Sequence, residues 1–82
     1  MKYILSHHAR LRMQERSIAE RLLADTLQDP TKIELDNKGK FLFKKLYKKE
    51  GRERLLLVVA IRAGNALKIV TVIDTSKVRK YL

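Results

Sequence analysis

The stretch "RLLLVVAIRAGNALKIVTVID", residues 54–74, decides the fold of this chain. Its first part, residues 54–62, is continuously apolar between two arginines, which predicts a central strand covered on both faces. Gly64 and Asn65 then predict a tight hairpin turn, and residues 67–74 have the composition of the returning strand. An antiparallel pair of strands is therefore expected at the centre of the fold.

Upstream of this pair, the sequence between Pro30 and the hairpin also alternates with a period of two. "KIEL", residues 32–35, and "FLFKKLYK", residues 41–48, predict two further strands. Turns are expected between them and again at "KEGR", residues 49–52. These segments predict four antiparallel strands in a meander, to which "KYIL", residues 2–5, would add a fifth at the edge.

Helical spacing dominates the segment before Pro30. Ser6 is a suitable N-cap for a helix that runs to about Arg16. "SIAE" then matches a capping box, with Ser17 as the N-cap and Glu20 three residues later. Apolar residues follow at helical spacing until Asp29 and Pro30 end the run. Two short helices joined by a tight corner are predicted.

The expected fold class is α+β, with two N-terminal helices packed on one face of an antiparallel sheet of four to five strands. With 82 residues, of which 45% are hydrophobic, the chain is expected to form one domain over residues 1–82.

Charge gives the first indication of function. The chain has 19 Lys and Arg against 9 Asp and Glu, a formal net charge of +10, which favours a polyanionic partner such as nucleic acid. An acidic protein partner fits the same charge, as does a basic surface without a catalytic role.

Cysteine is absent, which excludes disulfides and thiol chemistry and suits a reducing cytosol. The apolar start "MKYIL" is too short for a signal peptide, and the run from Leu55 to Ile61 is too short to span a membrane. A soluble cytoplasmic protein is expected.

The stretch "SHHARLRMQER", residues 6–16, carries the first candidate site. His8, Arg12 and Arg16 are each four residues apart and would form one stripe on a helix. Histidine can give or take a proton near neutral pH, and arginine donates a fixed fork of hydrogen bonds to phosphate. The stripe could therefore cleave RNA with His8 as general acid or base. The alternative is a structural His8, with solvated or ion-paired arginines.

A metal site is not expected. Adjacent residues on a helix point about 100° apart, so His7 and His8 cannot share one small site. The sequence has no pair of histidines four apart and no acidic cluster with ligand spacing. We therefore predict neither a metal nor another cofactor.

A second basic cluster lies in "KKLYKKEGRER", residues 44–54. Strand alternation predicts that Phe43, Lys45 and Tyr47 share one face, where rings could stack on unpaired bases. The alternatives are aromatic core residues and lysines that protect a strand edge. The predicted RNA-binding residues are Arg10, Lys44, Lys45, Lys48, Lys49, Arg52 and Arg54.

The residues quoted above also carry a family resemblance. "SHHARLRMQERSI" resembles the "HA-x-x-R-M-x-x-R-x-I" opening of a family of small bacterial domains of unknown function, which look like relatives of the BrnT and RelE/ParE toxins. The likeness continues through "LQDPTKIE" to "IVTVIDTSKVRKYL". It implies a RelE/ParE-like fold. The family pattern usually has glycine where this chain has Ser17.

The resemblance also implies functions. RelE-like toxins are mostly metal-independent ribonucleases that cut mRNA, often on the ribosome, and an acidic antitoxin neutralises them. Carried over to this chain, it adds Lys77, Lys80 and Tyr81 near the last strand to the candidate catalytic residues. We therefore expect a toxin of a type II toxin–antitoxin pair that binds and cleaves RNA. The alternative is a non-catalytic binding module, such as a ParE-like inhibitor or an RNA- or protein-binding domain.

Overall fold

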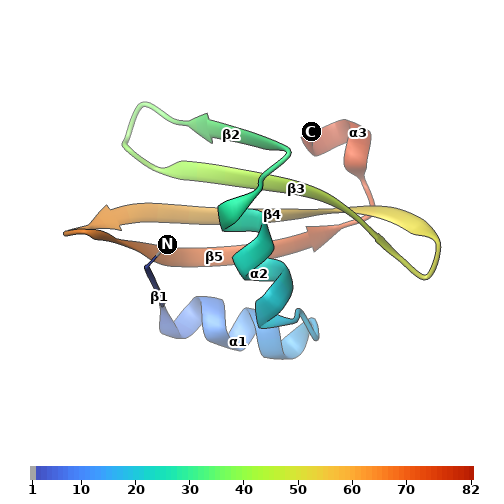
Figure 1. Ribbon diagram of the computed structural model, residues 1–82, viewed down its shortest axis with the longest axis horizontal. Coiled ribbons are helices and arrows are strands. Elements are labelled where there is room, and N and C mark those ends of the chain that lie inside the picture. The colour runs from blue at the N-terminus through green and yellow to red at the C-terminus, as the bar shows by residue number, and fades with distance from the viewer. Residues whose placement is uncertain (1) are drawn as a thin grey trace.

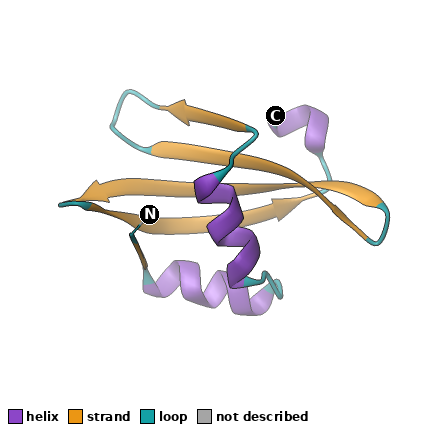
Figure 2. Cartoon of the chain, viewed as in Figure 1, coloured by secondary structure: helices purple, strands orange, loops and turns teal. Residues whose placement is uncertain are grey.

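The computed structural model describes residues 2–82 and contains three helices and five strands along that part of the chain (Figure 1). The helices are α1 (His7–Glu15), α2 (Glu20–Gln28) and α3 (Val78–Tyr81). The strands are β1 (Tyr3–Leu5), β2 (Lys32–Leu35), β3 (Phe41–Lys49), β4 (Arg52–Ala63) and β5 (Ala66–Thr75). The two predicted N-terminal helices and all five predicted strands are present, and α3 is an addition (Figure 2).

The strands form one sheet in the order β1-β5-β4-β3-β2. Strands β2 to β5 pair antiparallel with their neighbours, which confirms the predicted meander. The edge strand β1 instead pairs parallel to β5, with Tyr3 opposite Leu67 and Leu5 opposite Ile69. The expectation of a wholly antiparallel sheet was therefore wrong for this strand. Alternation specifies which residues share a face, but it contains no information on the direction in which distant strands pair.

Helices α1 and α2 lie on one face of the sheet (Figure 1), where the main core forms. From the helices, the buried residues are Ala9, Met13, Ile18, Leu23 and Leu27. From the strands they are Phe43, Leu56, Val58, Ala60, Ile69 and Val72. Leu56, Val58 and Ala60 are alternate residues of β4, so the residues between them along the strand face the other side of the sheet.

The other face of β4 is covered in part by α3, which the sequence did not predict. Leu55 and Leu57 are buried there, as expected for a central strand covered on both faces. Lys32 and Lys44 donate hydrogen bonds from Nζ to the backbone carbonyl of Leu82, at 3.2 and 3.4 Å. These bonds hold the end of α3 over β2 and β3.

The start of α1 follows the prediction, whereas the start of α2 does not. The Ser6 hydroxyl accepts a hydrogen bond from the backbone N–H of Ala9, which makes Ser6 the N-cap of α1. The N-cap of α2 is Ala19, which has no side chain able to cap. Ser17 lies in the corner with φ +53°, a left-handed conformation that glycine adopts readily. The predicted capping box at Ser17 was therefore wrong.

All three predicted turns are confirmed, and they join β2 to β3, β3 to β4 and β4 to β5. Glu50 and Gly51 join β3 to β4 and have φ values of +53° and +77°. Two consecutive positive φ values between paired strands are typical of a type I′ turn, whose twist matches that of the strands. Among the described residues, no helix is long and apolar enough to cross a membrane.

Candidate functional site

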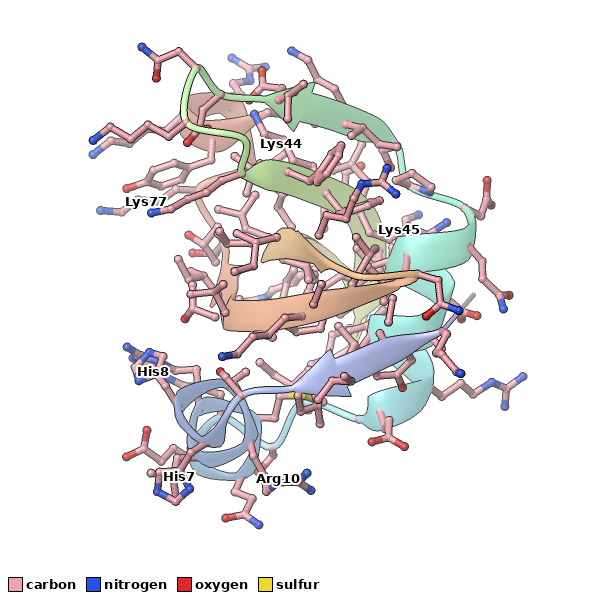
Figure 3. All side chains as sticks on the ribbon, turned by 90° about the vertical axis from the view of Figure 1, so that its left-hand side faces the viewer. His7, His8, Arg10, Lys44, Lys45 and Lys77 are labelled. Carbon is pink, nitrogen blue, oxygen red and sulfur yellow. The ribbon has the colours of Figure 1, made fainter. Side chains whose placement is uncertain are left out.

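Helix α1 exposes His8 and Arg16 to solvent because its other side is anchored in the core, whereas Arg12 between them is half-buried. Ala9 and Met13 are buried against the sheet. His8 lies beside them in sequence and is exposed. Figure 3 shows His7 and Arg10 pointing away from the sheet, while His8 projects sideways from α1. The helix is capped by Ser6, so the structure gives His8 neither a capping nor a core role.

Arg12 and Arg16 continue the stripe, and within residues 2–82 neither forms an ion pair with Glu15 or Glu20. The Nε atom of Arg12 is buried and has no hydrogen-bond partner among the described residues. Part of the donor capacity of Arg12 is therefore not used within residues 2–82.

Arg16, at the end of α1, opens onto a pocket of about 650 Å³ beside the β3–β4 turn. The residues that line this basic pocket are Arg16, Lys49, Glu50, Arg52, Arg54 and Asp74. They come from three separate parts of the chain: the end of α1, the β3–β4 hairpin and the end of β5. Four cations and two carboxylates meet here, which gives the basic pocket a net positive charge.

Asp74 is the fixed acidic group of the basic pocket. Its Oδ1 atom accepts a hydrogen bond from the hydroxyl of Tyr47 at 2.6 Å. Arg54 donates from Nε to Oδ1 at 3.1 Å and to Oδ2 at 3.3 Å. Tyr47 pairs with Arg54 across β3 and β4, while Asp74 comes from β5, so three strands hold this network.

The network perturbs two of its members. Burial, followed by the hydrogen bond to Asp74, raises the pKa of Tyr47 to about 12. The hydrogen bond to Asp74 is also the main reason why the pKa of Arg54 is raised. At neutral pH, Tyr47 is thus protonated, donates its hydroxyl hydrogen to Asp74 and cannot serve as a base.

The other predicted RNA-binding lysines are placed differently. Lys44 is buried and forms an ion pair with Glu34 at 2.9 Å. Lys45 pairs with Asp29 at 3.2 Å and donates to its backbone carbonyl at 2.6 Å. Lys48 is exposed, but it lies on the Lys44 face of β3, away from the α1 side. Of the predicted lysines, the structure brings only Lys49 to the basic pocket.

The aromatic residues of β3 mainly build the core. Phe43 is buried in it, and Tyr47 is partly buried against it with its hydroxyl bound to Asp74. The core alternative for Phe43 is therefore correct. Stacking of Tyr47 on an RNA base would require it to leave this network.

Lys77, Lys80 and Tyr81 lie in or next to α3, on the opposite face of the sheet from α1 and α2. Lys80 stands over the ring of Tyr81, with Nζ 5.4 Å from its centroid. Figure 3 labels Lys77 away from the α1 side chains. The structure does not bring these three residues together with His8, Arg12 and Arg16.

The role of Asp74 in this site was not predicted from the sequence. Counting back from the Glu50–Gly51 turn pairs Tyr47 with Arg54, so this part of the network could have been found. Asp74 depends on the register between β4 and β5, which shifts at Val59 and Ala60. An irregularity of this kind leaves no clear signal in an apolar strand.

No cluster of His, Cys, Asp and Glu residues in the described part of the chain, residues 2–82, could hold a metal ion. The site offers cationic donors, the exposed His8 and the half-buried carboxylate of Asp74.

Comparison with known proteins adds one finding. Residues 5–74 match a family described as a domain of unknown function, DUF4258. No curated protein matches the chain, and neither does any solved structure. The resemblance to BrnT and RelE/ParE toxins therefore stays a prediction. Because the match covers most of the sequence, the chain belongs to the DUF4258 family.

Proposed function

We propose that this protein binds RNA along a basic surface that starts at His8, follows α1 through Arg12 and Arg16, and ends in the basic pocket. The observation that carries the proposal is the convergence of Arg16, Lys49, Arg52 and Arg54 on one concave site. Three of them come from a hairpin and one from a helix, so neither element creates the site alone. Arginine and lysine at this density suit the phosphates of a nucleic acid.

The ion-pairing pattern supports an external anion. Arg54 is paired with Asp74, but Arg16, Lys49 and Arg52 have no ion pair within residues 2–82. By contrast, Lys44 and Lys45 are already paired inside the fold. Three of the four cations of the basic pocket are therefore available, while part of the second basic cluster forms ion pairs within the fold.

Binding to a labelled single-stranded RNA, measured by fluorescence anisotropy, tests the proposal. Replacing Arg16 or Lys49 by alanine should weaken binding by roughly tenfold each, as expected for loss of a charge-assisted contact to phosphate. Lys38→Ala is the matched control, because Lys38 is an exposed cation in the turn between β2 and β3 at the other end of β3. If all three variants lose the same affinity, binding depends on the net charge of the protein and not on the basic pocket.

RNA cleavage without a metal is the finer part of the proposal, with His8 as general acid or base and Arg12 and Arg16 as phosphate ligands. His8 is exposed on the same stripe, which supports access to a bound backbone. However, the rise of a helix puts eight residues, the separation from His8 to Arg16, at about 12 Å. A strand of RNA would therefore have to follow α1 to reach both the histidine and the basic pocket.

Cleavage assays in the presence of EDTA, on free RNA and on ribosome-bound mRNA, test this part. His8→Ala should reduce cleavage at least roughly tenfold to a hundredfold while leaving RNA affinity nearly unchanged. Arg12→Ala should reduce both. If the wild-type protein binds RNA and cleaves neither substrate, the protein is a binding module without catalysis.

The biological role that we propose is that of a toxin in a toxin–antitoxin pair. The motif of α1 and the α+β fold support it, as does a net charge of +10 that favours an acidic antitoxin. Expression of the protein alone should arrest growth, and a co-expressed acidic protein from a neighbouring gene should relieve the arrest. Lys77, Lys80 and Tyr81 are tested in the same assay. If alanine variants at these three positions keep full toxicity, the role of α3 is structural.

A further inference from the structure

The basic pocket combines cationic donors with one rigid hydrogen-bond acceptor, which phosphate alone does not explain. We propose that Asp74 distinguishes RNA from DNA by accepting a hydrogen bond from a ribose 2′-hydroxyl. The inference rests on the proposed RNA binding and adds to it a residue that selects the sugar.

The hydrogen bonds of Asp74 leave it capacity for a ligand. A carboxylate can accept about four hydrogen bonds over its two oxygens. Oδ1 already accepts from Tyr47 and from Arg54, whereas Oδ2 accepts only the longer branch of the Arg54 bond, at 3.3 Å. Asp74 nevertheless lines the basic pocket, although its side chain is only 10% exposed. Asp74 therefore keeps unused acceptor capacity at the wall of the basic pocket, on a carboxylate that Tyr47 and Arg54 hold in place.

The carboxylate of Asp74 lies among cations that attract a phosphate, whereas the carboxylate itself repels one. A negative charge beside a bound phosphate weakens binding unless another interaction compensates. Arg54 offsets part of this cost inside the protein, and Tyr47 fixes the orientation of the carboxylate. A ligand that brings a hydroxyl close to its phosphate would gain a hydrogen bond where a bare phosphate meets only repulsion. Ribose in RNA carries such a hydroxyl, and deoxyribose does not.

Glu50 provides a comparison within the same basic pocket. It also lines the wall, but it lies on the exposed β3–β4 turn and forms no ion pair within residues 2–82. Its carboxylate changes the local charge without presenting a rigid acceptor. The two acidic residues can therefore separate an effect of charge from an effect of hydrogen bonding.

The experiment compares a short oligouridylate with its 2′-deoxyuridine counterpart of equal length, so that base and phosphate are identical. With wild-type protein, the RNA should bind roughly tenfold more tightly, the size of one hydrogen bond to a charged acceptor. An oligouridylate with 2′-O-methyl groups, which cannot donate, should behave like the deoxy strand. These comparisons change only the ligand and so do not depend on the folding of a variant.

Protein variants then locate the effect. Asp74→Ala should bring the affinities for RNA and DNA to nearly the same value, even if both rise as the carboxylate is lost. Glu50→Gln, the matched control, should raise both affinities and keep their ratio. Thermal unfolding of each variant identifies changes of fold, and Tyr47→Phe, which keeps the carboxylate, should retain a preference for RNA.

Two failures are distinguishable. Should the wild-type protein bind no RNA, the proposed function itself is wrong. Should it bind RNA and its deoxy counterpart equally, or should a folded Asp74→Ala variant keep the full preference for RNA, RNA binding stands and the role of Asp74 is overturned.

Discussion

Ser17 shows at the scale of one residue how the corner between α1 and α2 is made. The chain turns there through a left-handed backbone conformation, φ +53°, which costs an L-residue roughly 1–2 kcal/mol. Serine was expected to act as a helix cap, but its place in the fold is set by this backbone conformation. Glycine would adopt the same conformation without strain.

Ser17→Gly should therefore stabilise the protein by about 0.5–1 kcal/mol, after the larger entropy of glycine in the unfolded chain is deducted. Equilibrium denaturation by urea would measure the change. Ser17→Ala is the control, because alanine is strained in the same conformation and should bring no such gain. A glycine variant no more stable than the wild type would contradict this account of the corner.

Tyr47 gives a second prediction at this scale. Its pKa is raised in the folded state to about 12, above an unfolded value near 10. The stabilising contribution of the neutral phenol is thus complete below about pH 10, and it is lost as the pH rises toward 12. In Tyr47→Phe, which cannot ionise, the fall of stability over this range should be smaller. Alkaline denaturation of both proteins, followed by circular dichroism, would reveal the difference; parallel curves would exclude a role for Tyr47.

At the scale of elements, the β2–β3 edge and α3 depend on one buried cation. Lys44 is only 5% exposed, pairs with Glu34 and donates to the carbonyl of Leu82. Burial of a charge without a partner is costly, so Glu34 is needed to keep Lys44 inside the fold. A lysine that looked like an RNA ligand in the sequence thus links two strands to a helix.

Acid should weaken this connection. Hydrogen bonds to Lys44 and then Lys32 hold the pKa of Glu34 below its usual value. Its contribution to stability is therefore present above the unfolded pKa, near 4.5, and is lost as the pH falls through the lower folded value.

Glu34→Gln should lower stability at neutral pH and make it less dependent on pH in the acid range. Lys44→Met, which replaces the buried charge by an apolar side chain of similar length, should cost less than Glu34→Gln. Urea denaturation at several pH values would measure both variants. If the pH dependence of Glu34→Gln equals that of the wild type, the ion pair does not control acid stability.

At the scale of the whole molecule, the cations behind the net charge of +10 differ in their surroundings. Lys32, Lys44 and Lys45 are paired with acidic residues in the β2–β3 region, while the basic pocket at the other end of β3 collects four cations. The fold thus brings part of the positive charge together in one concave site.

Salt dependence should report this concentration of charge. If Arg16, Lys49 and Arg52 each contact a phosphate of single-stranded RNA, the logarithm of affinity should fall with the logarithm of salt concentration at a slope of roughly −2. Arg52→Ala should make the slope shallower by about 0.7, the value of one phosphate contact. Lys38→Ala should leave the slope unchanged. A slope near zero in the wild type would indicate binding that does not depend on phosphate contacts.

The sequence alone determined the elements and most of the sheet. Strand alternation, apolar helix spacing and turn residues act over a few positions, so the five strands, the two N-terminal helices and the cap at Ser6 could be predicted. The stripe of His8, Arg12 and Arg16 was equally accessible, because residues four apart share one side of any α-helix. Tertiary structure decided the rest. The parallel pairing of β1, the packing of α3 and the register of β5 depend on contacts between distant segments. The basic pocket depends on them too, because Arg16, Arg54 and Asp74 meet only when a helix end, a hairpin and the last strand pack together.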